Sequence, residues 1–181
     1  MDIRDYLGGE RQNTSFDGTN AVDLFPHFTF DSRIQDNPDV GTITIQGVTI
    51  PCELWAVGEF KGFAVEVNHN CTPLPYLNPH MRVFPTDNNA GTFSFDFEWF
   101  VQHVDGTTSA GTTLNIAGEV SANDYQNGIG QYISGLIDGT GLVSGDILVG
   151  VVTRGAGTYT GDIAPTEVGM HARVDSLGDT F

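Results

Sequence analysis

Two carboxylates on one aromatic strand are the first residues of this chain to suggest chemistry. In the stretch GTFSFDFEWF, Asp96 and Glu98 are two positions apart and alternate with aromatic residues. Alternate residues of an extended chain point to opposite faces, so the two acids share a face, about 7 Å apart. A glycosidase could use such a pair, but no second acidic strand is marked. We therefore expect a solvated outer face, with the inner face of a sheet formed by Phe93, Phe95, Phe97 and Trp99.

Other catalytic arrangements are weakly marked in this sequence. It contains no G-x-S-x-G, H-E-x-x-H, Walker or C-x-x-C motif. His69 and Cys71 could act as a base and a thiol, but they lie on a bend ahead of Pro73 and need no such role. The sequence thus predicts a protein that is not an enzyme, without catalytic residues and without a cofactor.

A metal site is suggested by two similar tetrapeptides, HMRV and HARV. In an extended strand His80 and Arg82 share one face, and so do His171 and Arg173. Three imidazoles around a threefold axis could hold a divalent ion or an anion, but an arginine two residues away repels a cation. We therefore expect these four residues to be interface residues that bind no metal.

Two turns carry oxygen atoms that calcium accepts, DNPD at 36–39 and PTDNNAG at 85–91. Neither turn has the ligand spacing of a calcium-binding loop. Asparagine and aspartate are ordinary turn residues, so we expect both segments to be structural.

The charge of the chain excludes some classes of partner. Its 181 residues include 23 Asp and Glu but only 7 Lys and Arg, which gives a formal net charge of −16. A surface of this sign repels phosphate groups, so nucleic acid and anionic membranes are not expected partners. No apolar run is long enough to span a membrane, and the first residues show no signal peptide, so we expect synthesis in a cytoplasm and release by lysis. We expect Cys52 and Cys71 to be reduced.

The hydrophobic pattern has a period of two from Gly41 onward, with turn residues every few positions. This pattern, together with the lack of a helical period, is typical of an all-β protein built as an antiparallel sandwich or barrel. A possible turn falls at Gln46-Gly47, and 123–129 could form one helical turn. The pattern predicts about nine strands, at 42–50, 52–57, 60–67, 80–84, 92–104, 114–120, 132–137, 146–153 and 167–174.

The first 38 residues have a different character. Glycine and Asn-Pro pairs interrupt them, and at most one strand is expected there, at 28–34. We interpret 1–38 as an N-terminal arm and 39–181 as the sandwich domain. The arm has more apolar groups than a free tail usually carries, so we expect it to be ordered on assembly against a neighbouring subunit or the capsid shell. The apolar residues of this contact would be Tyr6, Leu7, Phe16, Leu24, Phe25, Phe28 and Phe30.

Two segments, 78–100 and 135–178, resemble the C-terminal jelly-roll module of bacteriophage virion proteins, which occurs in tail fibres and in head decoration or head fibre proteins. The matching marks are an initial Pro-His, an aromatic strand after a glycine turn, an arginine ahead of a Thr-Tyr turn, and a late histidine followed by Asp-Ser-Leu-Gly. In this chain they are Pro79-His80, Gly91 to Trp99, Arg154 with Thr158-Tyr159, and His171 with 175–178. The chain departs from the family at Arg82, Val83 and Ala172.

The resemblance implies an antiparallel β-sandwich of the jelly-roll type, commonly assembled as a homotrimer, without catalysis. From it we predict a virion structural protein, specifically a capsid decoration (cement) protein that bridges subunits of the major capsid protein. The alternative is a receptor- or carbohydrate-binding module of a tail or head fibre. In that alternative, sugars would stack on Tyr125, Tyr132 and Tyr159.

Overall fold

β-Strands make up nearly all of the regular structure in the described part of the chain. The computed structural model describes residues 13–14, 20–24, 38–67 and 76–174, with side chains within 38–67 and 77–170. Its one helix is the single turn α1 (Asp124–Asn127). The strands are β1 (Asn13–Thr14), β2 (Asn20–Leu24), β3 (Asp39–Ile45), β4 (Val48–Leu54), β5 (Phe60–Glu66), β6 (Tyr76–Pro85), β7 (Gly91–Gln102), β8 (Thr112–Val120), β9 (Gln131–Ser134), β10 (Ile137–Asp138), β11 (Ile147–Gly155) and β12 (Ile163–Val174).

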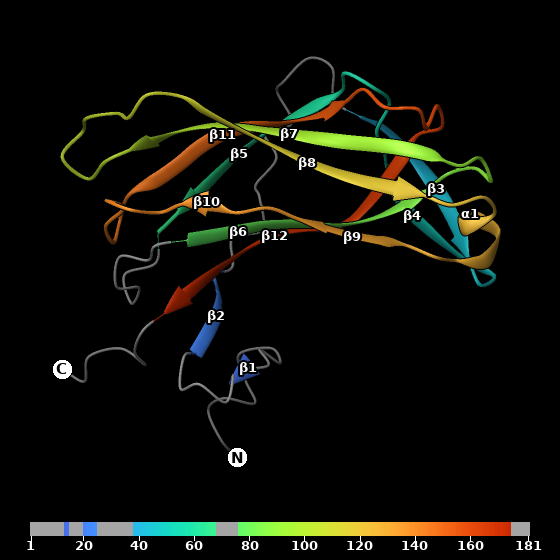
Figure 1. Cartoon of the computed structure of the whole chain (residues 1–181), viewed down its shortest axis with the longest axis horizontal. Helices are drawn as coiled ribbons and strands as arrows, with labels where there is room; N and C mark the ends of the chain where they lie inside the picture. The colour runs from blue at the N-terminus through green and yellow to red at the C-terminus, as the bar shows by residue number, and fades with distance from the viewer. Residues whose placement is uncertain (1–12, 15–19, 25–37, 68–75, 175–181) are drawn as a thin grey trace.

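The strands form two facing sheets and a separate hairpin (Figure 1). One sheet has the order β1-β2-β12-β6, with β9 and β10 both pairing the far side of β6. The other has the order β5-β11-β7-β8, and β3 pairs with β4 as the hairpin. Every pairing is antiparallel. The predicted all-β fold, an antiparallel sandwich of the jelly-roll type, is therefore confirmed.

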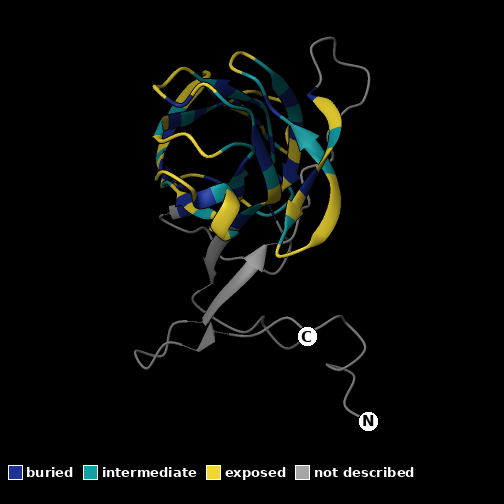
Figure 2. Ribbon diagram, turned by 90° about the vertical axis from the view of Figure 1, so that its right-hand side faces the viewer, coloured by how far each residue is buried: buried dark blue, intermediate teal, exposed yellow. Residues whose placement is uncertain are grey.

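The aromatic strand β7 supplies the centre of the core, as its alternation predicts. Phe93, Phe95 and Phe97 are at most 2% exposed, and Trp99 is 8% exposed. The ring of Trp55 meets Phe95 edge-on at 5.7 Å between ring centroids. Edge-to-face pairs of this kind add about 0.5–1.5 kcal/mol to the free energy gained by burying the rings. Viewed from the end, buried residues lie between the sheets and exposed residues lie on the outside (Figure 2).

A buried arginine connects the ends of several strands. Arg154, on β11, is 1% exposed and donates hydrogen bonds to the carbonyl oxygens of Trp55, Tyr159 and Gly161. The hydroxyl of Tyr159 in turn accepts the backbone N–H groups of Thr86, at 3.0 Å, and Asp87, at 3.1 Å. Two marks of the resemblance, Arg154 and Tyr159, thus lie in the core and hold loops to the sandwich, whereas Thr158 is exposed.

Some predicted strand boundaries are wrong. The expected strand 42–50 is two strands, because Gln46 and Gly47 both take a positive φ and form the tight turn of the β3–β4 hairpin. The expected strand 132–137 is likewise divided into β9 and β10. The helical turn expected within 123–129 is present as α1.

The region predicted to be an arm contains two described strands. β2 pairs with β12, with Leu24 opposite Met170, and β1 pairs with β2. The expectation of at most one strand in this region is therefore wrong, and its predicted location, 28–34, lies outside the described residues. The boundary at residue 38 stays a prediction.

In the part of the chain that the structure describes, no helix is long and apolar enough to cross a membrane. Cys52 is half-buried and carries a free thiol, whose pKa is raised above its usual value by burial. Cys71 lies outside the described residues.

Candidate functional site

A pocket of about 640 Å³ lies at the end of the sandwich where β7 turns back into β8. One wall comes from the ends of β7 and β8 and the loop between them, and the other from β10 and the loop that follows it. The lining residues combine large apolar side chains with a few polar ones. We refer to this cavity as the end pocket.

The loop beside the end pocket is held by a tight turn at its tip. Asp105 accepts hydrogen bonds from the backbone N–H of Thr107, at 2.9 Å, and from its hydroxyl, at 2.7 Å. Both bonds favour the carboxylate and lower the pKa of Asp105. Gly106 takes a φ of 87°, which glycine adopts without strain. The turn brings His103 and Ser109 to the pocket wall.

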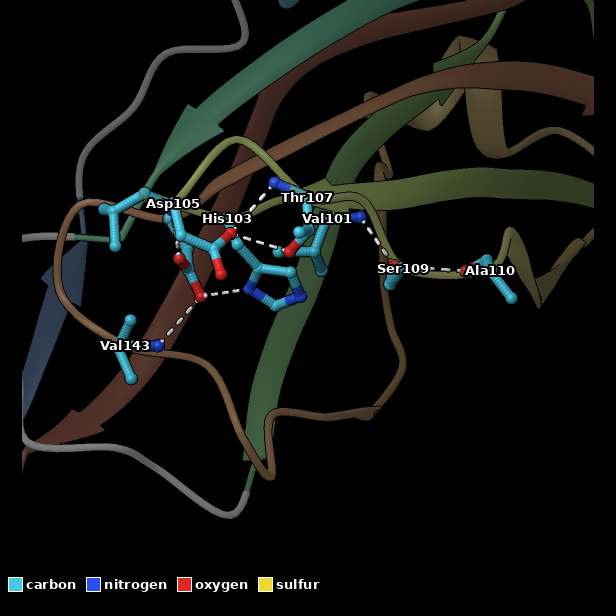
Figure 3. A network of polar contacts seen from close by, with 9 residues as sticks. Val101, His103, Asp105, Thr107, Ser109, Ala110 and Val143 are labelled. Atoms are coloured by element: carbon cyan, nitrogen blue, oxygen red, sulfur yellow. Dashed lines mark hydrogen bonds and ion pairs between the residues drawn. The ribbon is translucent and has the colours of Figure 1, made fainter.

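A buried carboxylate orients the pocket histidine (Figure 3). Asp146 is fully buried, and it lies 3.0 Å from Nδ1 of His103. It also accepts the backbone N–H groups of Val104, at 3.1 Å, and Val143, at 3.0 Å. Burial disfavours the charged carboxylate, but the bonds from Val143, His103 and Val104 outweigh burial and lower the pKa of Asp146.

The tautomer of the neutral His103 ring follows from this partner. An ionised carboxylate only accepts hydrogen bonds, so Nδ1 of His103 carries a proton and donates the hydrogen bond to Asp146. In the neutral imidazole, Nε2 is then an acceptor, and the ring is 31% exposed beside the pocket. A histidine fixed in this way can accept a hydrogen bond from a ligand or act as a general base.

Ser109 is not arranged as a nucleophile for this histidine. Its hydroxyl oxygen accepts the backbone N–H of Val101 at 2.8 Å, and its hydroxyl donates to the carbonyl oxygen of Ala110 at 3.1 Å (Figure 3). Both bonds go to the backbone, so Ser109 supports the loop between β7 and β8.

The predicted interface residues His80 and Arg82 lie on the outer face of β6. His80 is buried, with its ring stacked on Tyr132 at 5.5 Å between centroids and its Nε2 3.7 Å from Glu167. Arg82 is exposed and pairs with Glu167 at 2.6 Å, while its guanidinium lies over the ring of Tyr132. Gly169 on β12 leaves room for the imidazole ring. The structure thus brings these two residues into one cluster with partners on β9 and β12.

The other predicted interface residues are placed by backbone alone or not at all. His171 and Arg173 lie on β12, opposite Asp23 and Ala21 of β2, and Leu24 lies on β2. The rest of the predicted set, Tyr6, Leu7, Phe16, Phe25, Phe28 and Phe30, lies outside the described residues.

The acids of the aromatic strand lie on the outer face, as expected. Asp96 accepts a hydrogen bond from Asn115 at 2.6 Å, and Glu98 is exposed. Within the described residues, no group of three or more His, Cys, Asp or Glu side chains could hold a metal ion. In the turn at 85–91, both carboxylate oxygens of Asp87 bond to Asn89. Residues 36 and 37 of the other oxygen-rich turn lie outside the described part.

The three tyrosines considered for sugar stacking differ in exposure. Tyr159 is 1% exposed and Tyr125 is half-buried, whereas Tyr132 is 51% exposed. The suggestion that Tyr159 stacks on a sugar is therefore wrong, because its ring belongs to the core.

The sequence reasoning missed the pairing of His103 with Asp146. The two residues are 43 positions apart, and each falls at the boundary of an expected strand. The only local signal was the Asp105-Gly106 turn, which begins two residues after His103.

The two antiparallel sheets define a protein of the β-sandwich class. No family model matches the chain, and no curated protein matches it. Among solved structures, it is similar to the enzymatically active domain of tailspike protein 4 of bacteriophage CBA120, with 12% identity and a TM-score of 0.41. That match covers 80% of this chain and 19% of the tailspike chain. It is also similar to the Eiger TNF of S. frugiperda, with 10% identity, a TM-score of 0.31, and coverage of 80% and 92% of the two chains.

One prediction is corrected by these comparisons. The sequence predicted a protein without catalytic activity, whereas the first of these neighbours is described as an enzymatically active domain. The prediction of a non-enzyme is therefore contradicted. This chain spans less than a fifth of the tailspike domain, with coverage of 19%.

Proposed function

We propose that the chain is a phage virion protein that docks on the major capsid protein as a decoration protein. Support comes from the two segments that resemble the phage jelly-roll module. Their marks Arg154 and Tyr159 occupy buried positions that hold the sandwich together. The observation that carries the docking role is an apolar patch on an outer sheet face.

This patch, the docking face, lies on the outward side of β5, β11 and β7. Val149 is paired with Ala64 on one side and with Phe100 on the other, so the three side chains form a row across the sheet. Ile147 and Val151 point outward on the same strand as Val149, two residues away on each side. Ala64 and Phe100 are exposed, and the three β11 residues are half-buried. Apolar side chains gathered on one outward face are the kind of surface through which proteins contact one another.

The charges beside the docking face indicate the chemistry of that partner. Glu98 is paired with Val151, and Asp96 with Thr153, so carboxylates border the apolar row. The described cations lie elsewhere: Lys61 pairs with Glu53, Arg82 and Arg173 are on strands of the other sheet, and Arg154 is buried. The face therefore fits a protein surface with an apolar centre and a basic border. Such complementarity speeds and orients docking.

The matched substitutions Ala64→Asp and Ala117→Asp test the proposal. Both alanines are exposed, and both point outward from the same sheet, but Ala117 is opposite Ser94, away from the apolar row. Binding is measured to heads of the encoding phage assembled without this chain. We expect Ala64→Asp to weaken binding at least about tenfold, because a charge would be buried in a contact of about 1,200–2,000 Å². Ala117→Asp should bind like the unmodified chain.

Equal binding by both folded variants would contradict docking through this face. Binding of the unmodified chain should also weaken as salt rises, because the proposed partner is basic. The homotrimer belongs to the same proposal, and sedimentation equilibrium would measure it. The alternative function, a receptor- or carbohydrate-binding module, draws its support from a different feature, the end pocket.

A further inference from the structure

The end pocket combines an apolar floor with a polar rim. Trp99 lines it, together with five aliphatic side chains: Val101, Leu114, Leu136, Ile137 and Leu142. Hydroxyl groups, an imidazole and a carboxylate also line it, from Ser109, Thr112, Thr113, Thr140, His103 and Asp138. Small-molecule sites commonly have this composition, with apolar walls and a few placed polar groups.

The two acceptors of the rim are held by the protein. In the neutral imidazole of His103, Nε2 is an acceptor, because the hydrogen bond to Asp146 keeps the proton on Nδ1. Asp138 accepts the backbone N–H of Thr140 at 2.9 Å, and hydrogen bonds from the side chain and backbone of Thr140 lower its pKa. Asp138 is therefore ionised at neutral pH, and a carboxylate can accept two hydroxyl donors. The rim is prepared for a ligand that donates several hydrogen bonds.

The charge of the rim restricts the ligand further. Asp138 is the carboxylate of the lining, and no lysine or arginine lines the end pocket. An anionic ligand would meet a like charge without a compensating cation. The ligand class that offers apolar C–H surface, several hydroxyl donors and no negative charge is a neutral saccharide.

We propose that the end pocket binds a neutral saccharide, with its C–H surface against the floor at Trp99 and its hydroxyls on His103 and Asp138. The proposal does not rest on the docking face, which lies on the outward side of β5, β11 and β7. Failure of one proposal therefore leaves the other standing.

The two tryptophans of the chain give a direct test. Trp99 lines the end pocket, whereas Trp55 is fully buried in the core and its indole N–H lies 3.3 Å from Glu53. In the ¹⁵N-labelled full chain, the two indole signals are followed while glucose, galactose, mannose or N-acetylglucosamine is added to about 50 mM, well above a millimolar Kd. We expect at least one sugar to shift the Trp99 signal in a saturable manner and to leave Trp55 unchanged. Glucuronic acid should bind more weakly than glucose.

Two substitutions locate the binding. His103→Ala removes the rim acceptor and should weaken binding about five- to tenfold. Val104→Ala is the matched control, because Val104 is 64% exposed, does not line the pocket, and bonds to Asp146 only through its backbone. It should bind like the unmodified chain. The proposal is overturned if no sugar shifts Trp99 more than Trp55, if His103→Ala binds unchanged, or if glucuronic acid binds more tightly than glucose.

Discussion

Replacing Arg154 by methionine should destabilise the fold strongly. Its guanidinium is 1% exposed and donates to the carbonyl oxygens of Trp55, Tyr159 and Gly161. Burial lowers the pKa of Arg154, and the nearby charges of Asp162 and Glu59 oppose that shift. Methionine keeps an apolar stem of similar length but supplies no donor. The substitution therefore leaves three carbonyl groups without this partner.

The magnitude follows from two opposing effects. A buried polar group that loses its partner costs about 1–3 kcal/mol. The carbonyl oxygen of Trp55 still accepts the backbone N–H of Ile163, so the cost falls mainly on the carbonyls of Tyr159 and Gly161. Removing a buried cation recovers part of this loss, because the charge no longer has to be desolvated. We expect the free energy of unfolding to fall by about 3 kcal/mol, in the range measured for broken buried charge networks. In a domain of this size, that loss lowers Tm by about 6–12 °C.

Urea unfolding followed by circular dichroism would measure this loss. Arg154→Lys is the informative companion, because lysine keeps the charge but cannot reach three carbonyls with a planar fork of donors. It should be less stable than the unmodified chain as well. Neutral surface substitutions change the free energy of unfolding by up to about 0.5 kcal/mol. If the free energy of unfolding of Arg154→Met lies within that span of the value for the unmodified protein, the carbonyls do not depend on the guanidinium and the reasoning is refuted.

Two further substitutions probe the pocket support and the sandwich edge. Asp146→Asn should lower the urea midpoint at pH 7. The pKa of Asp146 in the folded protein lies below its unfolded value of about 3.9. The ionised carboxylate therefore contributes its full stabilisation above about pH 3.9, and this stabilisation is lost as the pH falls through the folded pKa. The stability gap between variant and unmodified chain should therefore narrow below about pH 4, and a constant gap would contradict the role of the charge. Gly91→Ala would place a Cβ against the backbone of Thr158 and Tyr159, and it should lower the free energy of unfolding, measured by thermal unfolding, by about 1–3 kcal/mol. Gly111→Ala is the control, because its Cβ would meet only the carbonyl oxygen of Trp99, at 3.9 Å, and it should be tolerated.

The sandwich could be predicted from sequence because each strand carries its own signal. In β7, alternating aromatic and polar residues define both the strand and the face that is buried. The sequence indicated a possible turn at Gln46-Gly47. Whether the chain turns there or continues as one strand depends on the backbone angles of these two residues, which the sequence does not give. The division of 132–137 into β9 and β10 depends on where β6 offers pairing partners.

The functional features depend on contacts between distant segments. The pocket histidine, His103, and its buried partner, Asp146, come from different loops. A histidine or an aspartate in a loop does not by itself indicate that it pairs with the other. Arg154 was recognised only as a mark of the resemblance. A charged residue on a strand is usually exposed, and its burial here requires carbonyls from two other loops. The docking face arises in a similar way, because the register of three strands aligns Ala64, Val149 and Phe100.

The order of the strands has a consequence for synthesis of the protein. The central partner in one sheet is β12, which lies between β2 and β6, and in the other it is β11, which lies between β5 and β7. Both central strands come from the last third of the described chain. Neither sheet can therefore be completed while only the earlier strands have left the ribosome. Proteins dominated by such distant pairings fold slowly. A nascent chain that stops before β11 would leave one edge of β7 and one edge of β6 without their strand partners, and unpaired edges of this kind favour aggregation.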